Sequence, residues 1–416
     1  MKNMKTVIIA AGKGTRMRPL TETRLKGSLL IQNQPLIRRL VELIHQAKML
    51  DELILIVSPG QEEEMLDLFK NQPYSDRIKI TTQDPPKGTA DAVAQAEPFI
   101  NKTDERLFVI NGDILAPLTH LLPKLLDHHK QLGAICSMVV TPGVSDRYGL
   151  LKVTDGQVKD IQEKVATSPS KKTSEEEPGY INCGIYLFER AIFKAIKETP
   201  LSKRGEYEIT DSIALLGRSA PIGAIKTDSW MSIENPVDLF YAQRFFTPSE
   251  NQDMQFHSGI DIGFKAVQET FFQEGMELEL SNVFFKGPVL VGQGALIEPG
   301  AQIGPNVWIG RDSIIESGSS ITQSLIMENC RISANSIVNF MIAGEEVVIG
   351  SKVVTKKAAP SLREAKMERL DKPSLDICDF VVVGGKAIIA SHVVLKKGIK
   401  IHAHEAIQKH SKQKKK

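Results

Sequence analysis

Aliphatic residues recur at every sixth position along the C-terminal part of this 416-residue chain. The step shortens by one residue once and then resumes, and glycine directly follows several of the repeated positions. Neither an α-helix nor an ordinary sheet has this period, whereas a hexapeptide β-helix stacks such side chains in its interior. The sequence therefore predicts a parallel β-helix. The repeated residues are Val291, Ile297, Ile303, Ile309, Ile315, Ile321, Ile326, Ile332, Val338, Val383, Ile389, Leu395 and Ile401.

Short apolar runs alternate with helical patterns in the N-terminal part of the chain. Runs at 53–57, 78–81, 107–110 and 134–140 are typical of buried strands, and the patterns at 35–47 and 61–70 are helical. Alternating β and α units predict an α/β fold with a doubly wound, mostly parallel sheet. We expect a first domain at 1–247, a linker and connecting segment at 248–280, the β-helix at 281–405 and a basic disordered tail at 406–416.

A glycine loop follows the first apolar run, at Gly12–Lys13–Gly14. Glycines allow main-chain N–H groups to approach a ligand closely, and Arg16, Arg18 and Lys26 add positive charge nearby. This combination suits a triphosphate. The loop lacks the Gly-Lys-Ser/Thr of a P-loop and the third glycine of a dinucleotide fingerprint. A tight strand-to-helix turn with incidental basic residues is the alternative interpretation.

The whole string Ala10-Ala11-Gly12-Lys13-Gly14-Thr15-Arg16-Met17, with Lys26 downstream, resembles the signature of the sugar-1-phosphate nucleotidylyltransferases. Its wording is nearest to the bifunctional N-acetylglucosamine-1-phosphate uridylyltransferase/acetyltransferase type, in which a left-handed β-helix follows the catalytic domain. The resemblance implies catalytic roles for Arg16 and Lys26. It implies nucleotide binding by Ala10, Ala11, Gly12, Gly14 and Thr15. Leu25 stands where the family usually has proline.

Gln83 precedes Gly88 and Thr89 in a proline-containing segment. A glutamine amide offers a paired donor and acceptor, which match the O4 and N3–H edge of uracil or thymine. By resemblance Gln83 reads the base, and Gly88 and Thr89 lie at the nucleotide. The alternative is a loop in which Thr89 or Ala90 merely starts a helix.

Asp113 ends a buried strand, and by resemblance it binds Mg²⁺. Capping of the next helix is the alternative role for this carboxylate. Relatives place a second metal-binding Asp or Asn where this chain has Ser232, and a hydroxyl is a weaker Mg²⁺ ligand. Either the ion relies on Asp113, water and phosphates, or Asp228 or Glu234 substitutes, or activity is low.

Three further short segments match the sugar-pocket motifs of the family, in the same order along the chain. By resemblance the sugar would contact Tyr148, Gly149, Glu163, Lys164 and Asn182, although each piece alone is typical of an ordinary turn, strand or surface pair. Thr210 or Asp211, in another family-like segment, could equally be a helix N-cap.

Composition sets limits on partners and location. The net charge of +2 excludes a broad nucleic-acid surface, and the chain has no apolar run near the length of a membrane span. The four cysteines are widely separated among apolar neighbours, which is typical of buried free thiols in a reducing compartment. We expect a cytoplasmic protein, and the resemblance implies a homotrimer or higher oligomer formed through the β-helix.

The resemblance implies Mg²⁺-dependent transfer from UTP to N-acetylglucosamine 1-phosphate, giving UDP-N-acetylglucosamine and pyrophosphate. Glucose 1-phosphate with UTP or dTTP, and mannose 1-phosphate with GTP, are alternatives. A catalytically weak regulatory subunit that binds nucleotide sugars is a third interpretation. Use of acetyl-CoA by the β-helix would need a general base, and His392, His402 and His404 are the candidates, but the acetyltransferase motif is not matched.

Overall fold

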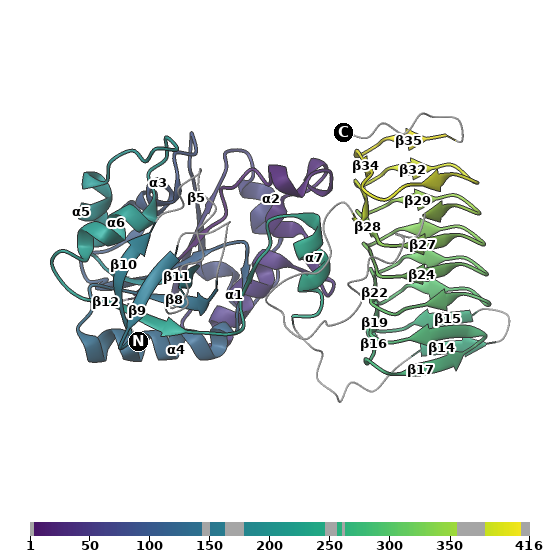
Figure 1. Cartoon of the computed structure of the whole chain (residues 1–416), viewed down its shortest axis with the longest axis horizontal. Helices are drawn as coiled ribbons and strands as arrows, with labels where there is room; N and C mark the ends of the chain where they lie inside the picture. Colours follow the sequence, from purple (N-terminus) through teal and green to yellow (C-terminus); the bar gives the residue numbers. More distant parts are fainter. Residues whose placement is uncertain are drawn as a thin grey trace, which may run out of the picture. The chain divides into compact units, whose positions relative to one another are not determined.

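The computed structural model describes residues 4–143, 150–162, 179–245, 256–259, 263–355 and 379–408. Residue contacts divide the chain into two compact units, which Figure 1 draws with their helices and strands. The first unit comprises Met1–Lys13 and Pro35–Ser232, and the second comprises Gly14–Gln34 and Ile233–Lys416. Of the predicted linker and connecting segment, residues 248–255 and 260–262 lie outside the described residues, whereas 256–259 and 263–280 contain strands of the β-helix. The predicted tail lies outside the described residues from residue 409 onward.

The first unit is built on a nine-stranded sheet with the order β5-β4-β1-β6-β11-β8-β12-β10-β9. The four strands from β5 to β6 are parallel, as the alternating pattern predicts. The strand β11 then runs antiparallel to both β6 and β8, so the sheet is mixed. The strands are β1 (Met4–Ile9), β4 (Glu52–Val57), β5 (Ile78–Thr82), β6 (Arg106–Asn111), β8 (Cys136–Pro142), β9 (Leu150–Thr154), β10 (Gln157–Gln162), β11 (Tyr180–Glu189) and β12 (Ile222–Lys226).

Helices pack against this sheet through their apolar faces. In α1 the helical spacing of Leu36, Leu40 and Ile44 puts all three side chains in the core, fully or almost fully buried. The helices of the unit are α1 (Leu36–Gln46), α2 (Glu62–Asp67), α3 (Thr89–Ala94), α4 (Leu118–Leu132), α5 (Ile192–Glu198) and α6 (Ile209–Leu216). Two short strands, β7 (Ile114–Leu115) and β13 (Met231–Ser232), pair with each other.

The second unit is a parallel β-helix with three faces, as the six-residue period predicts (Figure 1). One face is β14 (Phe256–Gly259), β15 (Gly263–Ala266), β20 (Leu296–Ile297), β23 (Ile314–Ile315), β26 (Arg331–Ile332), β29 (Val348–Ile349), β32 (Ile388–Ile389) and β35 (Ala406–Ile407). The next is β16 (Thr270–Phe272), β19 (Val289–Val291), β22 (Val307–Ile309), β25 (Ser324–Ile326), β28 (Met341–Ala343), β31 (Val381–Val383) and β34 (Lys400–Ile401). The third is β17 (Glu277–Leu280), β18 (Val283–Lys286), β21 (Gln302–Ile303), β24 (Ser320–Thr322), β27 (Ile337–Asn339), β30 (Val354–Thr355) and β33 (Val394–Leu395).

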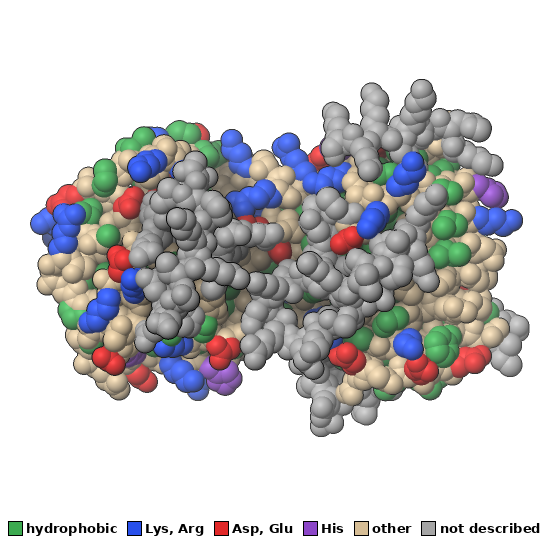
Figure 2. All heavy atoms as spheres, viewed as in Figure 1, with side chains coloured by type: hydrophobic (Ala, Val, Ile, Leu, Met, Phe, Trp, Pro, Cys, Tyr) green, Lys and Arg blue, Asp and Glu red, His purple; other side chains and the backbone are tan. Residues whose placement is uncertain are grey.

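The stacked register accounts for the dropped residue in the repeat. Val289 pairs with Val307, and Val307 pairs with Ser324, so the second coil is one residue shorter. The repeated aliphatic side chains, such as Ile315 and Ile321, are fully buried in the interior. Other apolar side chains point outward, and Figure 2 shows green patches on the exposed surface of this unit. The most exposed are Phe284, Ile337, Ile388 and Val394.

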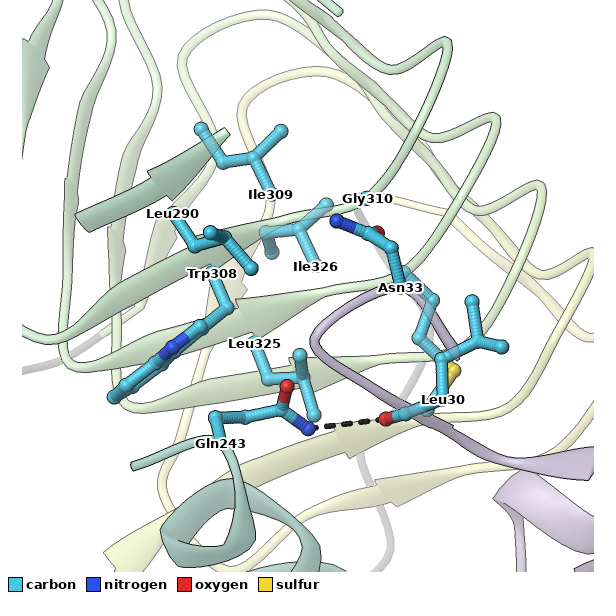
Figure 3. Close-up of a pocket in the computed structure, with 10 residues that line it drawn as sticks. Leu30, Asn33, Gln243, Leu290, Trp308, Ile309, Gly310, Leu325 and Ile326 are labelled. Carbon is cyan, nitrogen blue, oxygen red and sulfur yellow. Dashed lines mark hydrogen bonds between the residues drawn. The ribbon is translucent and has the colours of Figure 1, made fainter. Parts of the chain in front are cut away.

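The second unit also contains residues 14–34 and the helix α7 (Pro236–Ala242). Phe240 of α7 packs edge-to-face on Trp308 of β22, with ring centroids 5.1 Å apart. The side-chain amide of Gln243 donates to the carbonyl oxygen of Leu30 at 3.0 Å, as Figure 3 shows. These contacts seat α7 and the 30–33 segment on the outer face of β19, β22 and β25. The small pocket left there is lined mainly by apolar side chains (Figure 3).

Several sequence-based alternatives are decided by these elements. The helix α4 begins at Leu118 with Pro117 at its N-cap, so Asp113 does not cap it. The N-cap of α6 is Glu208, so the capping role considered for Thr210 or Asp211 is wrong. Three cysteines, Cys136, Cys183 and Cys330, are buried free thiols as predicted, while Cys378 lies outside the described residues. Within the described ranges no helix has the length and apolar character needed to cross a membrane.

Candidate active site

The glycine loop folds so that Lys26 lies beside Gly14. Gly14 has a left-handed backbone with φ +62°, and a Cβ on it would lie 3.3 Å from the Cβ of Lys26. Thr21 closes the loop by donating its hydroxyl to the carbonyl oxygen of Gly14 at 2.8 Å. Gly12 by contrast is exposed, with open space where a side chain would be. The loop therefore combines a bare backbone with an ammonium-bearing side chain at its closure.

Arg16 lies on the exposed side of this loop. Its guanidinium forms an ion pair with the carboxylate of Glu234, although 75% of the Arg16 side chain is exposed. Thr15 and Arg16 belong to a short 3-10 turn, Thr15–Met17, that Met17 anchors in the core. Glu234 was one candidate to replace the missing metal ligand, and the structure pairs it with Arg16.

The end of β1 is fixed by backbone and side-chain hydrogen bonds. The amide of Ala10 donates to the carbonyl oxygen of Ile56 at 2.7 Å, and the hydroxyl of Ser58 donates to that of Ala11 at 2.8 Å. Both contacts tie the strand end to β4 and the residue after it. The first residues of the glycine loop therefore start from a rigid strand.

Gln83 lies immediately after β5, with only 3% of its surface exposed. Its amide nitrogen donates to the carbonyl oxygen of Gly88 at 2.9 Å and to the carboxylate of Asp91 at 2.7 Å. Both amide protons are therefore used within the protein, which leaves the amide oxygen as the group that a ligand can meet. The predicted donor and acceptor pair is thus reduced to an acceptor. The sequence analysis did not identify Asp91 as a partner of Gln83. An acidic residue in the first turn of a helix is usually explained by its favourable interaction with the helix dipole.

Gly88 and Thr89 join the start of α3 to the segment before α6. Gly88 has φ +115°, and a Cβ on it would lie 2.5 Å from the carbonyl oxygen of Tyr207. The hydroxyl of Thr89 accepts a hydrogen bond from the amide of Ile209 at 3.0 Å. The predicted helix start at Thr89 is confirmed. Gln83, Gly88 and Thr89 therefore lie together at one edge of the first unit.

Two short paired strands place Asp113 next to Ser232. One of them, β7, begins directly after Asp113, and the other, β13, ends with Ser232. Ser232 of β13 pairs with Ile114 of β7, the residue directly after Asp113. Gly112 lets the chain pass close to β1, because a Cβ there would lie 2.9 Å from the carbonyl oxygen of Ile9. Its amide donates to that same oxygen at 2.8 Å. The structure thus brings the predicted metal ligand and the serine in the second ligand position together.

These donors fit Mg²⁺ bound mainly through substrate. The described residues contain no group of three or more His, Cys, Asp or Glu side chains that would hold a metal by themselves. Mg²⁺ usually keeps several water molecules and binds one or two carboxylates together with substrate phosphates. One carboxylate from Asp113 and one hydroxyl from Ser232 match that mode. Asp228, the other candidate ligand, is exposed.

Asn182 of β11 is engaged by its own strand. Its side-chain amide donates to the hydroxyl of Tyr186 at 2.7 Å, and its oxygen accepts from the amide of Gly184 at 3.0 Å. These bonds fix the side chain where β11 breaks register with β8. The other predicted sugar residues, Tyr148, Gly149, Glu163 and Lys164, lie outside the described residues.

Comparison with known proteins decides the family. The model of the family described as nucleotidyl transferase matches residues 5–249. The chain belongs to this family. The match confirms the predicted enzyme class and the resemblance from which it came. A second model, described as the GMPPB C-terminal domain, matches residues 285–416, which include most of the β-helix.

Individual relatives of this nucleotidyl transferase carry several substrate names. It is 28% identical over 372 residues to the bifunctional protein GlmU of Methanocaldococcus jannaschii, covering 85% of this chain and 80% of the relative. It is 28% identical to mannose-1-phosphate guanylyltransferase 1 of Arabidopsis thaliana, covering 83% and 88% of the two chains. It is 24% identical to a glucose-1-phosphate thymidylyltransferase of Streptomyces griseus, covering 84% and 94%.

Proposed function

We propose that this nucleotidyl transferase joins a nucleoside triphosphate to a sugar 1-phosphate, with UTP and N-acetylglucosamine 1-phosphate as the expected pair. The products are UDP-N-acetylglucosamine and pyrophosphate. The observation that carries the proposal is the packing of the Lys26 stem against Gly14, which brings a side chain that bears a cation to the glycine loop. The names of the relatives, all of which handle sugar phosphates or carry the GlmU name, support the substrate class.

The reaction is an in-line displacement at phosphorus. A phosphate oxygen of the sugar 1-phosphate forms a bond to the α-phosphorus, and the bond from that phosphorus to the bridging oxygen of pyrophosphate breaks. A phosphate monoester is largely a dianion at pH 7, because its second pKa is about 6, so no protein base is needed. The work of the protein is to position the phosphates and neutralise their charge.

Each residue then has a role that follows from its chemistry. Lys26 would hold the phosphates at the reacting centre, and Arg16 would exchange Glu234 for the β and γ phosphates. Asp113, with Ser232 beside it, would hold Mg²⁺, and the ion would supply positive charge to neutralise phosphate. Asp113 and Ser232 belong to the first unit, and Lys26 and Arg16 belong to the second.

Gln83 would select the base of the nucleoside triphosphate. Its amide oxygen accepts from a ring N–H, which uracil offers at N3 and guanine at N1. The second candidate function is therefore transfer from GTP to mannose 1-phosphate. It is favoured by the similarity of the chain to mannose-1-phosphate guanylyltransferase 1 of Arabidopsis thaliana.

The test is pyrophosphate release measured over a grid of UTP, dTTP and GTP against the 1-phosphates of N-acetylglucosamine, glucose and mannose, with Mg²⁺. The highest kcat/KM for UTP with N-acetylglucosamine 1-phosphate supports the first candidate. The highest value for GTP with mannose 1-phosphate supports the second. Nucleotide binding without pyrophosphate release in any combination would instead support a regulatory subunit, the interpretation that Ser232 suggested.

The β-helix has a structural role in this proposal, and it associates with other copies of the chain. Of the three candidate bases for acetyl transfer, His402 is paired with Glu22 at 2.8 Å. His392 and His404 occupy corner positions with left-handed backbone, φ +62° and +60°. The same assay carried out with acetyl-CoA and an amino sugar phosphate tests for acetyl transfer, and we expect none.

A further inference from the structure

Arg24 lies between two carboxylates that come from successive coils of the β-helix. Its guanidinium is 2.8 Å from the carboxylate of Glu328 and 3.7 Å from that of Glu345. These three side chains are only 17%, 15% and 11% exposed. Glu328 follows β25 and Glu345 follows β28, two strands that pair in parallel. The guanidinium also contacts the sulfur of Met327 at 3.9 Å.

A second contact holds the same segment two residues earlier. The carboxylate of Glu22 accepts hydrogen bonds from the ring of His402 at 2.8 Å and from the amide of Ala403 at 2.9 Å. Gly385 leaves room for this arrangement, because a Cβ on it would lie 2.6 Å from the hydroxyl of Thr23. Residues 22–24 are thus fixed to the β-helix side chain by side chain.

The charge arrangement makes Arg24 necessary at this place. Poorly exposed carboxylates cost free energy unless a cation compensates them, and like charges on adjacent coils repel. Glu328 and Glu345 each keep one buried oxygen without a hydrogen-bond partner within the described residues. The β-helix therefore presents two neighbouring carboxylates, and the segment that follows the glycine loop supplies the cation that compensates them.

The position of Arg24 is transmitted to Lys26 along a short, hydrogen-bonded turn. The segment Lys26–Ser28 is a 3-10 helix directly after Leu25. The amide of Ser28 donates to the carbonyl oxygen of Leu25 at 3.1 Å, and that of Leu29 donates to Lys26 at 3.2 Å. Gly27, Ser28 and Leu29 are buried. Little freedom remains between the guanidinium of Arg24 and the backbone of Lys26.

We propose that Arg24 is a positioning residue for Lys26, and that Glu328 and Glu345 of the β-helix set its position. The β-helix then contributes to catalysis by holding the loop that carries the cation, with no substrate contact of its own. This inference rests on the role of Lys26 in the proposed function. A misplacement of about 1 Å at such a site lowers the rate by about a hundredfold.

The test compares full-length variants at saturating substrate. In Glu328→Gln the side chain keeps its size and loses the charge that holds Arg24. We expect kcat to fall about tenfold or more, with KM for the nucleotide and the unfolding midpoint nearly unchanged. We expect kcat to be lower still in Arg24→Met, and kcat of Arg24→Lys to lie between that of Arg24→Met and the wild-type value. The matched control is Glu316→Gln, which removes a carboxylate paired with Arg331 at 2.7 Å elsewhere on the β-helix.

A folded Glu328→Gln variant with kcat within twofold of the wild-type value would overturn the inference. If Arg24→Met fails to fold, Glu328→Gln and Arg24→Lys still decide it. Amide exchange in residues 22–29 gives a readout independent of activity, and we expect faster exchange in Glu328→Gln than in Glu316→Gln. A wild-type protein that releases no pyrophosphate would contradict the proposed function. Equal rates of amide exchange in residues 22–29 of the two variants would contradict the inference that Glu328 holds this segment through Arg24.

Discussion

At the scale of single residues, two glycines in one loop differ in what they require. Gly14 has φ +62° and the Cβ of Lys26 close to it, whereas Gly12 has neither a left-handed backbone nor any atom within 4 Å of an added Cβ. A side chain at 14 would strain the backbone and press on the stem of Lys26. The same addition at 12 meets only open space.

We therefore expect Gly14→Ala to lower the free energy of unfolding by about 1–2 kcal/mol, the cost of a left-handed conformation for a residue with a Cβ. Turnover should fall as well, because Lys26 is displaced. Gly12→Ala is the control and should change the urea midpoint little. Equal midpoints for the two variants would be inconsistent with the loop geometry described above.

His129 gives a prediction about pH. It is 1% exposed, and its ring nitrogens contact the hydroxyl of Ser137 at 2.9 Å and the carboxylate of Glu189 at 3.1 Å. Burial lowers the pKa of His129 below its usual 6.5, and the opposing effect of Glu189 does not restore it. The unfolded chain therefore takes up a proton more readily than the native protein as pH falls through 6.5.

The contribution of His129 to stability should be full above this pH and should be lost as pH falls toward the lowered native pKa. Urea unfolding at about pH 7.5 and about pH 5.5 measures the effect. In His129→Gln, which cannot take up a proton, the difference between the two midpoints should be smaller than in the wild type. A difference as large as in the wild type would exclude His129 as its source.

The sequence suggests candidate site positions but not the partners of their side chains. Gly14, Lys26, Gln83 and Asp113 are candidates because they match successive motifs of the family. The pairing of Gln83 with Asp91 was not predictable, because a glutamine amide can point either way until the tertiary structure supplies an acceptor. The same reason applies to Arg16, whose partner Glu234 is 218 residues away.

At the scale of elements, periodicity located the strands and helices well and their ends less well. The helix predicted at 61–70 is α2 at Glu62–Asp67, and the helix predicted at 35–47 is α1 at Leu36–Gln46. The antiparallel direction of β11 was not visible in the sequence. A buried strand has the same apolar pattern whichever way its neighbours run.

The helix α7 has a capping box that predicts its contribution to stability. The side chain of Asn235 accepts from the amides of Val237 and Asp238, and Asp238 accepts in return from the amide of Asn235 at 3.0 Å. Asn235→Ala should therefore lower the free energy of unfolding by about 1 kcal/mol. Denaturant unfolding monitored by Trp fluorescence checks this. An unchanged midpoint would mean that α7 does not depend on its cap.

At the scale of the whole molecule, the six-residue period predicted the β-helix and its first short coil. The next coil, in which Leu325 pairs with Ile342, is also one residue shorter, and the sequence analysis did not predict that. The period could not predict that residues 14–34 belong to the same compact unit as the β-helix. That assignment depends on contacts such as Arg24 with Glu328, which join residues far apart in the sequence and follow no local pattern. Motif and repeat therefore indicated two domains, and only the structure divides the glycine loop at Gly14.

Exposed aliphatic side chains on the β-helix lead to a prediction about assembly. Ile337, Ile388 and Val394 are 44%, 53% and 44% exposed, and apolar side chains on the outside of the β-helix suit contact with another copy of the chain. We expect a homo-oligomer, with a trimer favoured, in light scattering coupled to gel filtration. Ile337→Glu together with Ile388→Glu should lower the oligomeric mass. A wild-type monomer at micromolar concentration would contradict this expectation.

The central claim is that Lys26, held at the closure of the glycine loop, binds the phosphates at the reacting centre. The most direct test is kcat for pyrophosphate release by Lys26→Ala on the preferred substrate pair, with exposed Lys102→Ala as control. We expect kcat to fall about a hundredfold or more in Lys26→Ala, as loss of one preorganised charge contact produces. A folded Lys26→Ala protein with the turnover of the Lys102→Ala control would contradict it.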